Sequence, residues 1–582
     1  MNIIGIAALY HDSSACLLID GKLKSAAQEE RFTRIKHDKS FPINAIKFCL
    51  KQNDLVIDDI DLIVFYEKPF IKFDRIINTL QYEAPFAFSF FRNSILEWTK
   101  TKLWIPSLIK SKLAYKDKVI FSEHHEAHAA ASFFTSPFEE SAILTIDGVG
   151  EKTCTSIAIG RGNTVTLLKE QHYPHSIGLL YSAFTQYCGF KVNSGEYKLM
   201  GLAPYGKPVY KQLILDHIVS YSNEGVIEVN MNYFAFERGI STINSNFCKL
   251  FGKDTRQPEA KMDAFYFDVA NSIQAVIEDI IICLANYAKQ VTGLDNLCLS
   301  GGVALNCKAN GELIKQGIFK NFWVQPSAGD AGCAIGAAYL GYYHYSKQSR
   351  IILDTTLNIQ TYLGPSYSHD VIRTQLDTFN LKYNILSDKE RSSYIANALS
   401  HKMIIGWFRG KMEFGPRALG NRSILASPLF EDMKQYLNLR IKKREGFRPF
   451  APIVLEDFSD QWFEECTMSK YMTYTYSSSR KEDIPSCIHE DGTARVQTLS
   501  KADNEALYNV ITAFKTITNC PVLINTSFNV RGEPIVASPL DALKCFFQTD
   551  IDILVLEDFV VTKTDNPNPS LTLLTPNYYE LD

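Results

Sequence analysis

The hydrophobic pattern of the first forty residues predicts three short strands joined by polar turns. Apolar residues dominate IIGIAAL, ACLLI and LKSAAQ, and the polar stretches YHDSS and DGK separate them. Asp20-Gly21 is a strong hairpin signal, because glycine accepts the positive φ that tight turns between strands require. The pattern recurs from Ala142 as AILTID, TSIAIG and TVTLLKE. We therefore predict a β-meander that occurs twice in the chain.

Helical and strand–turn–helix segments follow these meanders. DAFYFDVANSIQAVIEDIIICLANYAKQ carries its apolar residues at helical spacing. NLCLSGGVALNCKANGEL and NFWVQPSAGDAGCAIGAAYLGYY each run from a strand through a glycine-rich turn into a helix. Such turns let backbone N–H groups approach an anion at the helix N-terminus. Together with the repeated meander, they predict an α/β fold, a duplicated nucleotide-binding domain of the actin and sugar-kinase kind.

The regular pattern is lost over residues 346–372, which we interpret as a linker. The sequence thus predicts one domain over 1–350 and a second α/β domain over 371–582. A chain of 582 residues is too long for one hydrophobic core, which also favours at least two domains.

Composition narrows the class of protein. Hydrophobic residues make up 46% and charged residues 21%, and the net charge is only -4, so bulk charge points to neither a nucleic-acid nor a membrane partner. The 13 cysteines are scattered without a CxxC pair, which is typical of a reducing compartment. The apolar N-terminus lacks a basic leader and no apolar run is long enough to span a bilayer. We expect a cytoplasmic protein.

The stretch SEHHEAHAAASFF raises the question of a metal site. On a helix, His124 and His128 lie one turn apart on one face, which suits two ligands of one metal, whereas His125 points elsewhere. Asp147, at the end of a predicted strand, and Asp330, in a glycine-rich turn, are the candidate third and fourth ligands. Two imidazoles with two carboxylates suit iron, zinc or manganese. The alternatives are solvent-facing histidines and, for Asp147, a turn-forming residue before Gly148.

A basic region marks the second domain. Between Arg409 and Arg448 there are ten Lys or Arg residues and four acids. Arg417 and Arg422 lie among glycine and proline residues, and Arg444 and Arg448 lie in REGFRPFAP. Arginines in such rigid loops favour forked binding of phosphate or carboxylate, although charge runs are also common on solvated faces. RNA binding is a weaker alternative, because no RNA-binding motif accompanies the local charge.

Eleven motifs occur in order from residue 11 to residue 535 and so cover nearly the whole chain. They are HDSSAC, EERFTRIKHDKSFP, HHEAHAAAS, IDGVGE, SGEYKLMGLAPYG, LSGGVALN, PSAGDAGCAIGAA, GPRALGNRSILA, REGFRPFAP, DGTARVQ and NTSFNVRGEPI. In these motifs the chain resembles the O-carbamoyltransferases of the nodulation and antibiotic-tailoring family.

The resemblance implies two linked activities. The N-terminal domain would be TsaD-like, similar to the metal-dependent domain that transfers threonylcarbamoyl groups to transfer RNA. The C-terminal domain would be YrdC-like, similar to the enzyme that makes threonylcarbamoyl adenylate. The expected reaction joins carbamate from carbamoyl phosphate to AMP from ATP, and then transfers the carbamoyl group to a hydroxyl of a small natural-product acceptor. ATP with Mg²⁺ is the expected co-substrate, and the expected metal is Fe²⁺, with Zn²⁺ or Mn²⁺ as alternatives.

The resemblance also implies roles for individual residues. The metal ligands would be His124, His128, Asp147 and Asp330. His11 would be a general base and Lys39 would contact the adenylate, with turn capping and a surface position as their alternatives. The nucleotide or carbamoyl adenylate would be bound by Gly148, Gly301, Gly302, Asn306 and Gly329. Carbamoyl phosphate and ATP would be bound by Arg417, Arg422, Lys443, Arg444, Arg448, Arg495, Asn525 and Ser527.

The sequence leaves the acceptor pocket, the partners and the roles of some motif residues unassigned. Glu196 and Lys198 would line the cleft between lobes without an assigned role. Residues 60–115 and 208–260 match no motif and are aromatic-rich in part, so an acceptor pocket could be built there. The chain is expected to be a monomer or homodimer without nucleic-acid or membrane partners. The alternatives are a transfer-RNA modification enzyme that uses threonine and bicarbonate, a kinase or ATPase built on the duplicated fold, and a nucleotide-gated binding protein.

Overall fold

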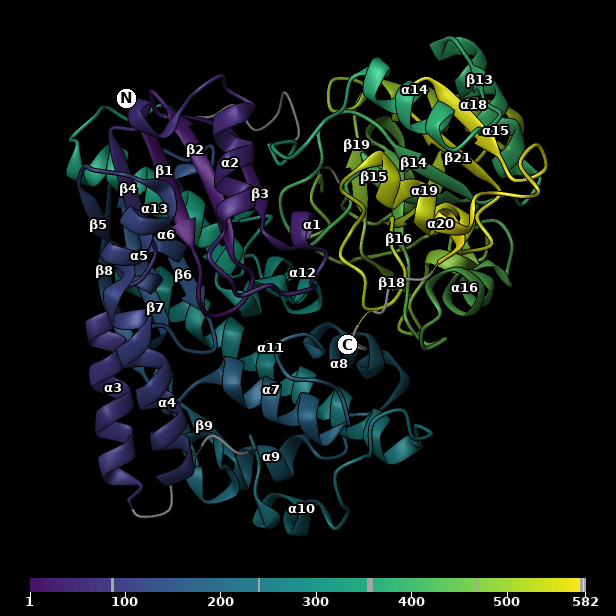
Figure 1. Cartoon of the computed structure of the whole chain (residues 1–582). Helices are drawn as coiled ribbons and strands as arrows, with labels where there is room; N and C mark the ends of the chain where they lie inside the picture. The colour runs from purple at the N-terminus through teal and green to yellow at the C-terminus, as the bar shows by residue number, and fades with distance from the viewer. Residues whose placement is uncertain (85–87, 239–240, 353–359, 467, 576–578, 580–582) are drawn as a thin grey trace. The chain divides into compact units, whose positions relative to one another are not determined.

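The computed structural model describes residues 1–84, 88–238, 241–352, 360–466, 468–575 and 579. The chain divides into two compact units (Figure 1). Unit 1 consists of Met1–Glu29 and His37–Leu353, and unit 2 consists of Glu30–Lys36 and Asp354–Leu581. Part of the predicted linker, residues 353–359, lies outside the described residues. The domain boundaries at 350 and 371 stay a prediction.

Two five-stranded sheets of the same topology form the core of unit 1, which confirms the predicted duplication and α/β class. In each sheet three antiparallel strands form a meander. The first strand of that meander pairs in parallel with one later strand, which in turn pairs in parallel with a second later strand. The first sheet has the order β3(Lys22–Gln28), β2(Ser14–Ile19), β1(Asn2–Ala7), β4(Leu62–Phe65), β5(Val119–Phe121). The second has the order β12(Asn321–Val324), β11(Asn296–Ser300), β6(Glu140–Ile146), β7(Thr153–Arg161), β8(Thr164–His172).

Helices α6 (His124–Phe134) and α13 (Cys333–Leu340) pack against each other, and each contacts strands of a sheet. Small residues make the packing close. A Cβ on Gly336 would stand 1.8 Å from the carbonyl oxygen of Ala127, so only glycine fits there. α13 also approaches β1, where a Cβ on Gly5 would stand 1.9 Å from the carbonyl oxygen of Ala334. The alanine-rich run in the motif thus lets two helices hold their N-terminal turns near one another.

Unit 1 also contains helices that the strand pattern alone does not place. The predicted long helix is confirmed as α11 (Ala264–Thr292). The unmatched segment 60–115 forms α3 (Pro69–Tyr82), α4 (Phe88–Lys100) and α5 (Ile105–Leu113), and residues 85–87 of it lie outside the described residues. In Figure 1, α3 and α4 run side by side away from the two sheets. The other unmatched segment, 208–260, includes β9 (Val219–Tyr221), η5 (Phe236–Arg238) and α10 (Ser245–Phe251), and residues 239–240 of it lie outside the described residues.

Unit 2 is built on one mixed sheet of eight strands, so it is an α/β unit as predicted. The strand order is β13(Asn384–Ile385), β22(Phe559–Thr562), β21(Ile553–Leu556), β14(Ile405–Phe408), β15(Arg422–Ala426), β20(Val522–Ser527), β16(Ala451–Leu455), β19(Gln497–Leu499). The helices include α14(His369–Thr378), α15(Asp388–Ser400), α18(Glu505–Thr518) and α19(Pro539–Phe547), with α15 packed on α18.

Unit 2 includes a short piece of the N-terminal sequence, the segment Glu30–Lys36 with helix α1 (Glu30–Thr33). Arg34 holds this segment in place. Its guanidinium donates to the carbonyl oxygens of Ile535 and Pro534 and pairs with Glu533 at 3.1 Å. The EERFTRIKHDKSFP motif therefore includes a structural contact of unit 2. None of the described helices meets the length and hydropathy that a membrane crossing requires.

Candidate metal centre and anion pocket

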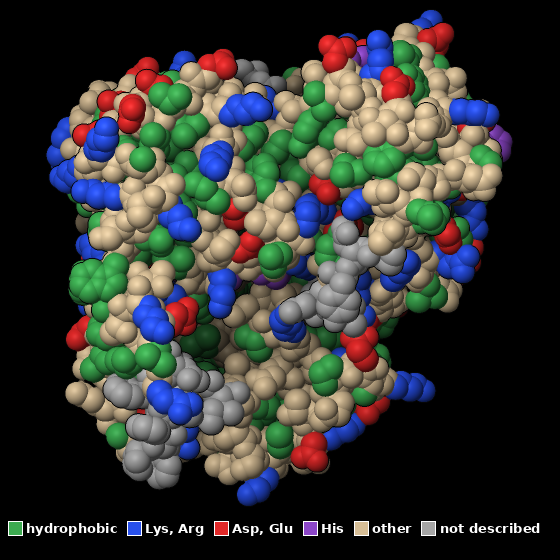
Figure 2. All heavy atoms as spheres, in the orientation of Figure 1, with side chains coloured by type: hydrophobic (Ala, Val, Ile, Leu, Met, Phe, Trp, Pro, Cys, Tyr) green, Lys and Arg blue, Asp and Glu red, His purple; other side chains and the backbone are tan. Residues whose placement is uncertain are grey.

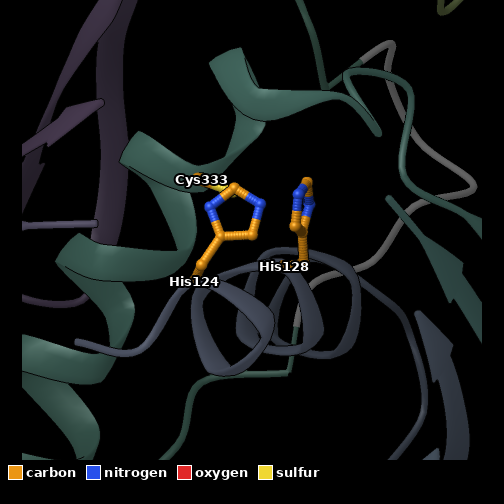
Figure 3. A group of neighbouring side chains, drawn as sticks. All are labelled: His124, His128 and Cys333. Atoms are coloured by element: carbon orange, nitrogen blue, oxygen red, sulfur yellow. The ribbon is translucent and has the colours of Figure 1, made fainter. Parts of the chain in front are cut away.

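The two imidazoles of the candidate metal centre come from the first turns of α6. Figure 3 shows His124 and His128 side by side on that helix, pointing towards the turn that leads into α13. The Glu151 carboxylate accepts the backbone N–H of His124 at 3.0 Å, an N-terminal helix position that favours a negative charge. His125 is turned away and its Nδ1 lies 2.9 Å from Ser156 Oγ. The predicted orientation of the three histidines is thus the observed one.

Asp147 and Asp330 complete a compact group. Asp147 follows β6, and Asp330 opens the turn η7 (Asp330–Gly332) before α13. His124 Nε2 lies 3.2 Å from Asp147 Oδ2 and 3.8 Å from Asp330 Oδ1, and His128 Nε2 lies 3.7 Å from Asp330 Oδ1. One ligand atom from each of the four residues lies within 4.8 Å of the others, and all four side chains are buried.

This donor set fits a divalent metal ion. His128 Nε2 is buried and has no hydrogen-bond partner within the described part of the chain, and the nearby carboxylate oxygens supply negative charge. Burial by itself lowers the pKa of His124, but Asp330 and Asp147 raise it to about 9. Burial raises the pKa of Asp147, yet His124 and His128 hold it well below its usual range. Two imidazoles and two carboxylates are ligands that iron, zinc and manganese share, so the geometry does not choose among them.

Cys333 is a second candidate donor in the same place, since it forms a group with His124 and His128 (Figure 3). Burial first, and then Asp330, raise the pKa of the Cys333 thiol well above its usual range. A protonated thiol is a poor ligand, because the thiolate is the form that binds metal. The carboxylates are therefore the better partners for the two histidines.

His11 lies at the edge of this centre, in the loop after β1. Its Nδ1 lies 3.1 Å from Asp12 Oδ2, and its Nε2 lies 3.8 Å from Asp330 Oδ2. Burial lowers the pKa of His11, but Asp330 and Asp12 raise it to about 10, and a cation on Asp330 would oppose that effect. The side chain of Lys39 is exposed, while its carbonyl oxygen accepts the N–H of Leu9. The catalytic roles of His11 and Lys39 stay predictions.

The predicted glycine-rich turns shape the metal centre directly. Gly302 donates its backbone N–H to Asp147 Oδ1 at 2.9 Å, which fixes the direction of that carboxylate. Gly301 has φ +88°, and a Cβ there would stand 2.2 Å from the carbonyl oxygen of Ile146. Asn306 caps α12 (Cys307–Lys315) by accepting the N–H of Ala309, and its side-chain amide donates to Gln274. These contacts give the residues structural roles, and nucleotide contact by Gly148, Gly301, Gly302, Asn306 and Gly329 stays a prediction.

In unit 2 the central feature is a buried lysine that the sequence analysis did not select. Lys442 ends the π-helical turn η9 (Leu437–Lys442), and its Nζ lies 3.2 Å from Ser527 Oγ and 3.0 Å from Asn529 Oδ1. It also donates to the carbonyl oxygens of Ser527 and Asn529. Burial first, and then the positive charge of Arg444, lower the pKa of Lys442 well below its usual range. A buried ammonium among neutral oxygens and other cations creates an environment that favours an anion.

Lys443, the predicted ligand, faces another way. It has left-handed backbone geometry, φ 52°, which reverses the chain after η9. Its side chain is exposed and Nζ lies 3.5 Å from the carbonyl oxygen of Gln548. The contacts therefore place Lys442 beside Ser527, and a substrate role for Lys443 stays a prediction.

Two predicted arginines, Arg444 and Arg448, lie close enough to Lys442 to lower its pKa. Arg444 Nε donates to Asn438 Oδ1 at 2.7 Å. Arg448 is buried and its Nε lies 3.0 Å from Glu445 Oε2, while the same carboxylate lies 3.5 Å from Arg531 Nη2. The Arg531 backbone N–H donates to the carbonyl oxygen of Lys442. Positive charge is thus concentrated at one place in unit 2.

The remaining predicted residues of unit 2 differ in their contacts. Arg422 is fully buried, donates to four backbone carbonyl oxygens and lies 3.6 Å above the Phe408 ring, which favours a structural role. Asn525 Nδ2 donates to Ala418 and Gln497, while Asn525 Oδ1 and Arg495 Nε are buried and have no hydrogen-bond partner among the described residues. Arg417 is half-buried in the loop before β15. Their substrate contacts stay predictions.

Two family models match the chain over most of its length. The model described as "Carbamoyltransferase N-terminus" matches residues 2–339, and that described as "Carbamoyltransferase C-terminus" matches residues 396–563. The chain is 44% identical to the uncharacterized protein sll1178 of Synechocystis, over 100% of both chains. It is 34% identical to nodulation protein NolNO of Sinorhizobium fredii, over 98% of this chain and 82% of that protein. Among solved structures, HypF of T. kodakarensis is similar with a TM-score of 0.31 and 14% identity, over 60% of this chain and 48% of that one.

Proposed function

Because this chain belongs to the carbamoyltransferase family and is an enzyme of that class, we propose that it is an ATP-dependent O-carbamoyltransferase with a carbamoyl adenylate intermediate. Three reactions would follow one another. Carbamoyl phosphate and water give carbamate and phosphate; carbamate and ATP give carbamoyl adenylate and pyrophosphate; the adenylate and an alcohol give a carbamate ester and AMP. The acceptor would be a small natural product with a free hydroxyl.

The first two reactions are assigned to unit 2. The observation that carries this assignment is the buried Lys442, held among neutral oxygens with Arg444 and Arg448 close enough to affect its pKa. Arginine forks and a lysine ammonium suit the phosphate of carbamoyl phosphate and the phosphates of ATP. Ser527 and Asn525 would complete the pocket, the latter with a buried oxygen that lacks a partner among the described residues.

The third reaction is assigned to the metal centre of unit 1. His124, His128, Asp147 and Asp330 would hold the metal, which when bound supplies positive charge to the phosphate and carbonyl of the adenylate. Gly302 orients Asp147, and Glu151 holds the helix that carries the histidines. We assign the hydroxyl proton to His11 Nε2, because Asp12 lies beside Nδ1 and leaves Nε2 directed towards the centre.

A product assay tests this function. The purified protein, with ATP and Mg²⁺, should release pyrophosphate only when carbamoyl phosphate is added. Release that instead requires threonine and bicarbonate would favour the transfer-RNA modification alternative. ADP in place of pyrophosphate would favour a kinase or ATPase and refute the proposal.

A further inference from the structure

Helix α3 of unit 1 presents two cations on one face, each above a tyrosine ring. Lys72 and Arg75 are three residues apart, so they lie about one turn apart on the same face. Lys72 Nζ is 4.6 Å from the Tyr10 ring centroid, and the Arg75 guanidinium carbon is 4.9 Å from that of Tyr173. These two pairs form a wall of aromatic rings and positive charge, called here the α3 wall.

The two cations differ in how their charge is balanced. Lys72 is buried and pairs with Glu67 at 2.6 Å. Arg75 is half-buried, its Nε is buried without a hydrogen-bond partner, and no carboxylate of the described residues lies within ion-pair distance of it. Stacking on a tyrosine keeps the guanidinium plane oriented while its N–H groups stay available. Arg75 is therefore a cation held in a fixed orientation. The described part of the chain supplies no carboxylate to pair with it.

The α3 wall lies beside the metal centre. The Tyr10 ring is 4.9 Å from that of His11, whose Nε2 faces Asp330. Tyr173 donates its backbone N–H to Lys152, the neighbour of Glu151, which holds the first turn of α6. Three residues after Tyr173, the Ser176 hydroxyl donates to the carbonyl oxygen of Asp147.

The two segments without motifs meet at this wall. α3 packs against η5, and Glu83 at the end of α3 pairs with Arg238 at 2.8 Å. The Tyr173 ring also lies 6.0 Å from that of Phe236. Figure 2 shows the surface of unit 1 hollowed between the α3–α4 helices and the part that carries α7 (Ile177–Tyr187) and α11. Segments that carry no family motif and border the reaction centre are suited to acceptor selection.

We propose that Arg75, stacked on Tyr173, binds an anionic group of the acceptor and so makes the enzyme select hydroxyl compounds that also carry a carboxylate, sulfate or phosphate. This inference rests on the proposed function, since it assumes that an acceptor hydroxyl reacts at the metal centre. Cationic acceptors are disfavoured by the same charge. The other anion that could reach Arg75 is the phosphate of the adenylate, which every acceptor would share.

Matched acceptor pairs separate these two sources of negative charge. The wild type, Arg75→Ala, Arg75→Lys and Arg92→Ala would be supplied with carbamoyl phosphate, ATP and one acceptor at a time. The acceptors are gluconate and gluconamide, glucuronate and glucuronamide, 4-hydroxybenzoate and its amide, and glucosamine as a cationic member. Mass spectrometry gives kcat/KM for each carbamoylated product, and pyrophosphate release is followed in the same samples. Arg92 is an exposed arginine on the neighbouring helix α4 and serves as the matched control.

The wild type should prefer carboxylates over their amides by about 10- to 150-fold, as expected for a charge-assisted hydrogen bond. Arg75→Ala should remove that preference and leave the amides and pyrophosphate release unchanged, which also shows that the variant is folded. Arg75→Lys should retain part of the preference, and Arg92→Ala all of it. The inference is overturned if amides or glucosamine are preferred, if Arg75→Ala lowers every acceptor equally, or if no carboxylate is carbamoylated while pyrophosphate is released. Failure of the wild type to release pyrophosphate would instead count against the proposed function.

Discussion

Replacing Lys442 by methionine should weaken the binding of carbamoyl phosphate to unit 2 and leave the unit folded. The side chain is buried, and among the described residues its ammonium donates hydrogen bonds only to oxygens of Ser527 and Asn529. Loss of one charge-assisted hydrogen bond to a phosphate costs about 1.5–3 kcal/mol, which corresponds to about a 10- to 150-fold higher KM for carbamoyl phosphate. Methionine has a similar shape and no charge, so the fold should tolerate it.

The stability of the same variant should depend on pH in a defined direction. The pKa of Lys442 is lowered in the folded protein, so the unfolded chain binds more protons between the folded and the unfolded pKa. Wild-type stability should therefore rise with pH in that window, and Lys442→Met should lack this rise. Arg444, Arg448, Glu533 and Cys545 act on Lys442 and remain in both proteins, so the difference between the two isolates the lysine.

The assay is pyrophosphate release at increasing carbamoyl phosphate, with thermal unfolding followed from pH 7 to about pH 10, near the ordinary lysine pKa. Lys443→Met is the matched control, since Lys443 is adjacent in sequence but exposed and directed at Gln548. An unchanged KM for carbamoyl phosphate in Lys442→Met would refute the reasoning. A larger increase in KM in Lys443→Met would also refute it, and would favour Lys443, the residue that the sequence analysis selected, as the substrate ligand.

Three further predictions concern the two sites separately. His128→Ala should lose bound metal, measured by elemental analysis, and carbamoyl transfer, yet keep pyrophosphate release; retention of metal and transfer would show that the ligand assignment is wrong. Arg448→Ala should do the reverse, abolishing pyrophosphate release with metal content intact, and normal release would contradict its place in the pocket. Glu151→Gln weakens the anchor of the helix that carries His124 and should lower metal affinity about 10- to 100-fold in a chelator competition, a typical effect for residues that orient ligands. An exposed control, Glu139→Gln, should leave the affinity unchanged, and equal loss in both variants would rule out the anchoring role.

Much of unit 1 follows from local patterns. The two meanders were predictable because each strand is a short apolar run bounded by turn residues. Asp20-Gly21 closes the hairpin between β2 and β3, with Gly21 at φ +75°. The grouping of His124 and His128 was predictable because helical spacing alone places them on one face. The position of Asp147 and Asp330 beside the histidines could be predicted only with the duplicated topology. That topology brings the ends of two strands and the start of α6 together.

Other features depend on which way the backbone turns and on contacts between residues far apart in the chain. Local sequence patterns encode neither. Lys442 and Lys443 are chemically identical neighbours, and only the left-handed turn at Lys443 decides which one is buried. Arg417 and Arg422 belong to the same basic motif, yet Arg422 opens β15 and its side-chain N–H groups donate to backbone carbonyl oxygens. Arg75 lies in a segment without motifs. Only the packing of α3 against Tyr173 shows that no described residue accepts a hydrogen bond from its Nε.

The central claim is that the carbamoyl group passes through an adenylate. The most direct measurement is a single-turnover reaction with ¹³C-labelled carbamoyl phosphate and ATP, quenched rapidly and analysed for labelled carbamoyl adenylate by mass spectrometry. We predict that the labelled adenylate forms together with equal amounts of phosphate and pyrophosphate, and that Lys442→Met lowers all three. Transfer of label to an acceptor with ADP as the nucleotide product, and without any labelled adenylate, would contradict the mechanism.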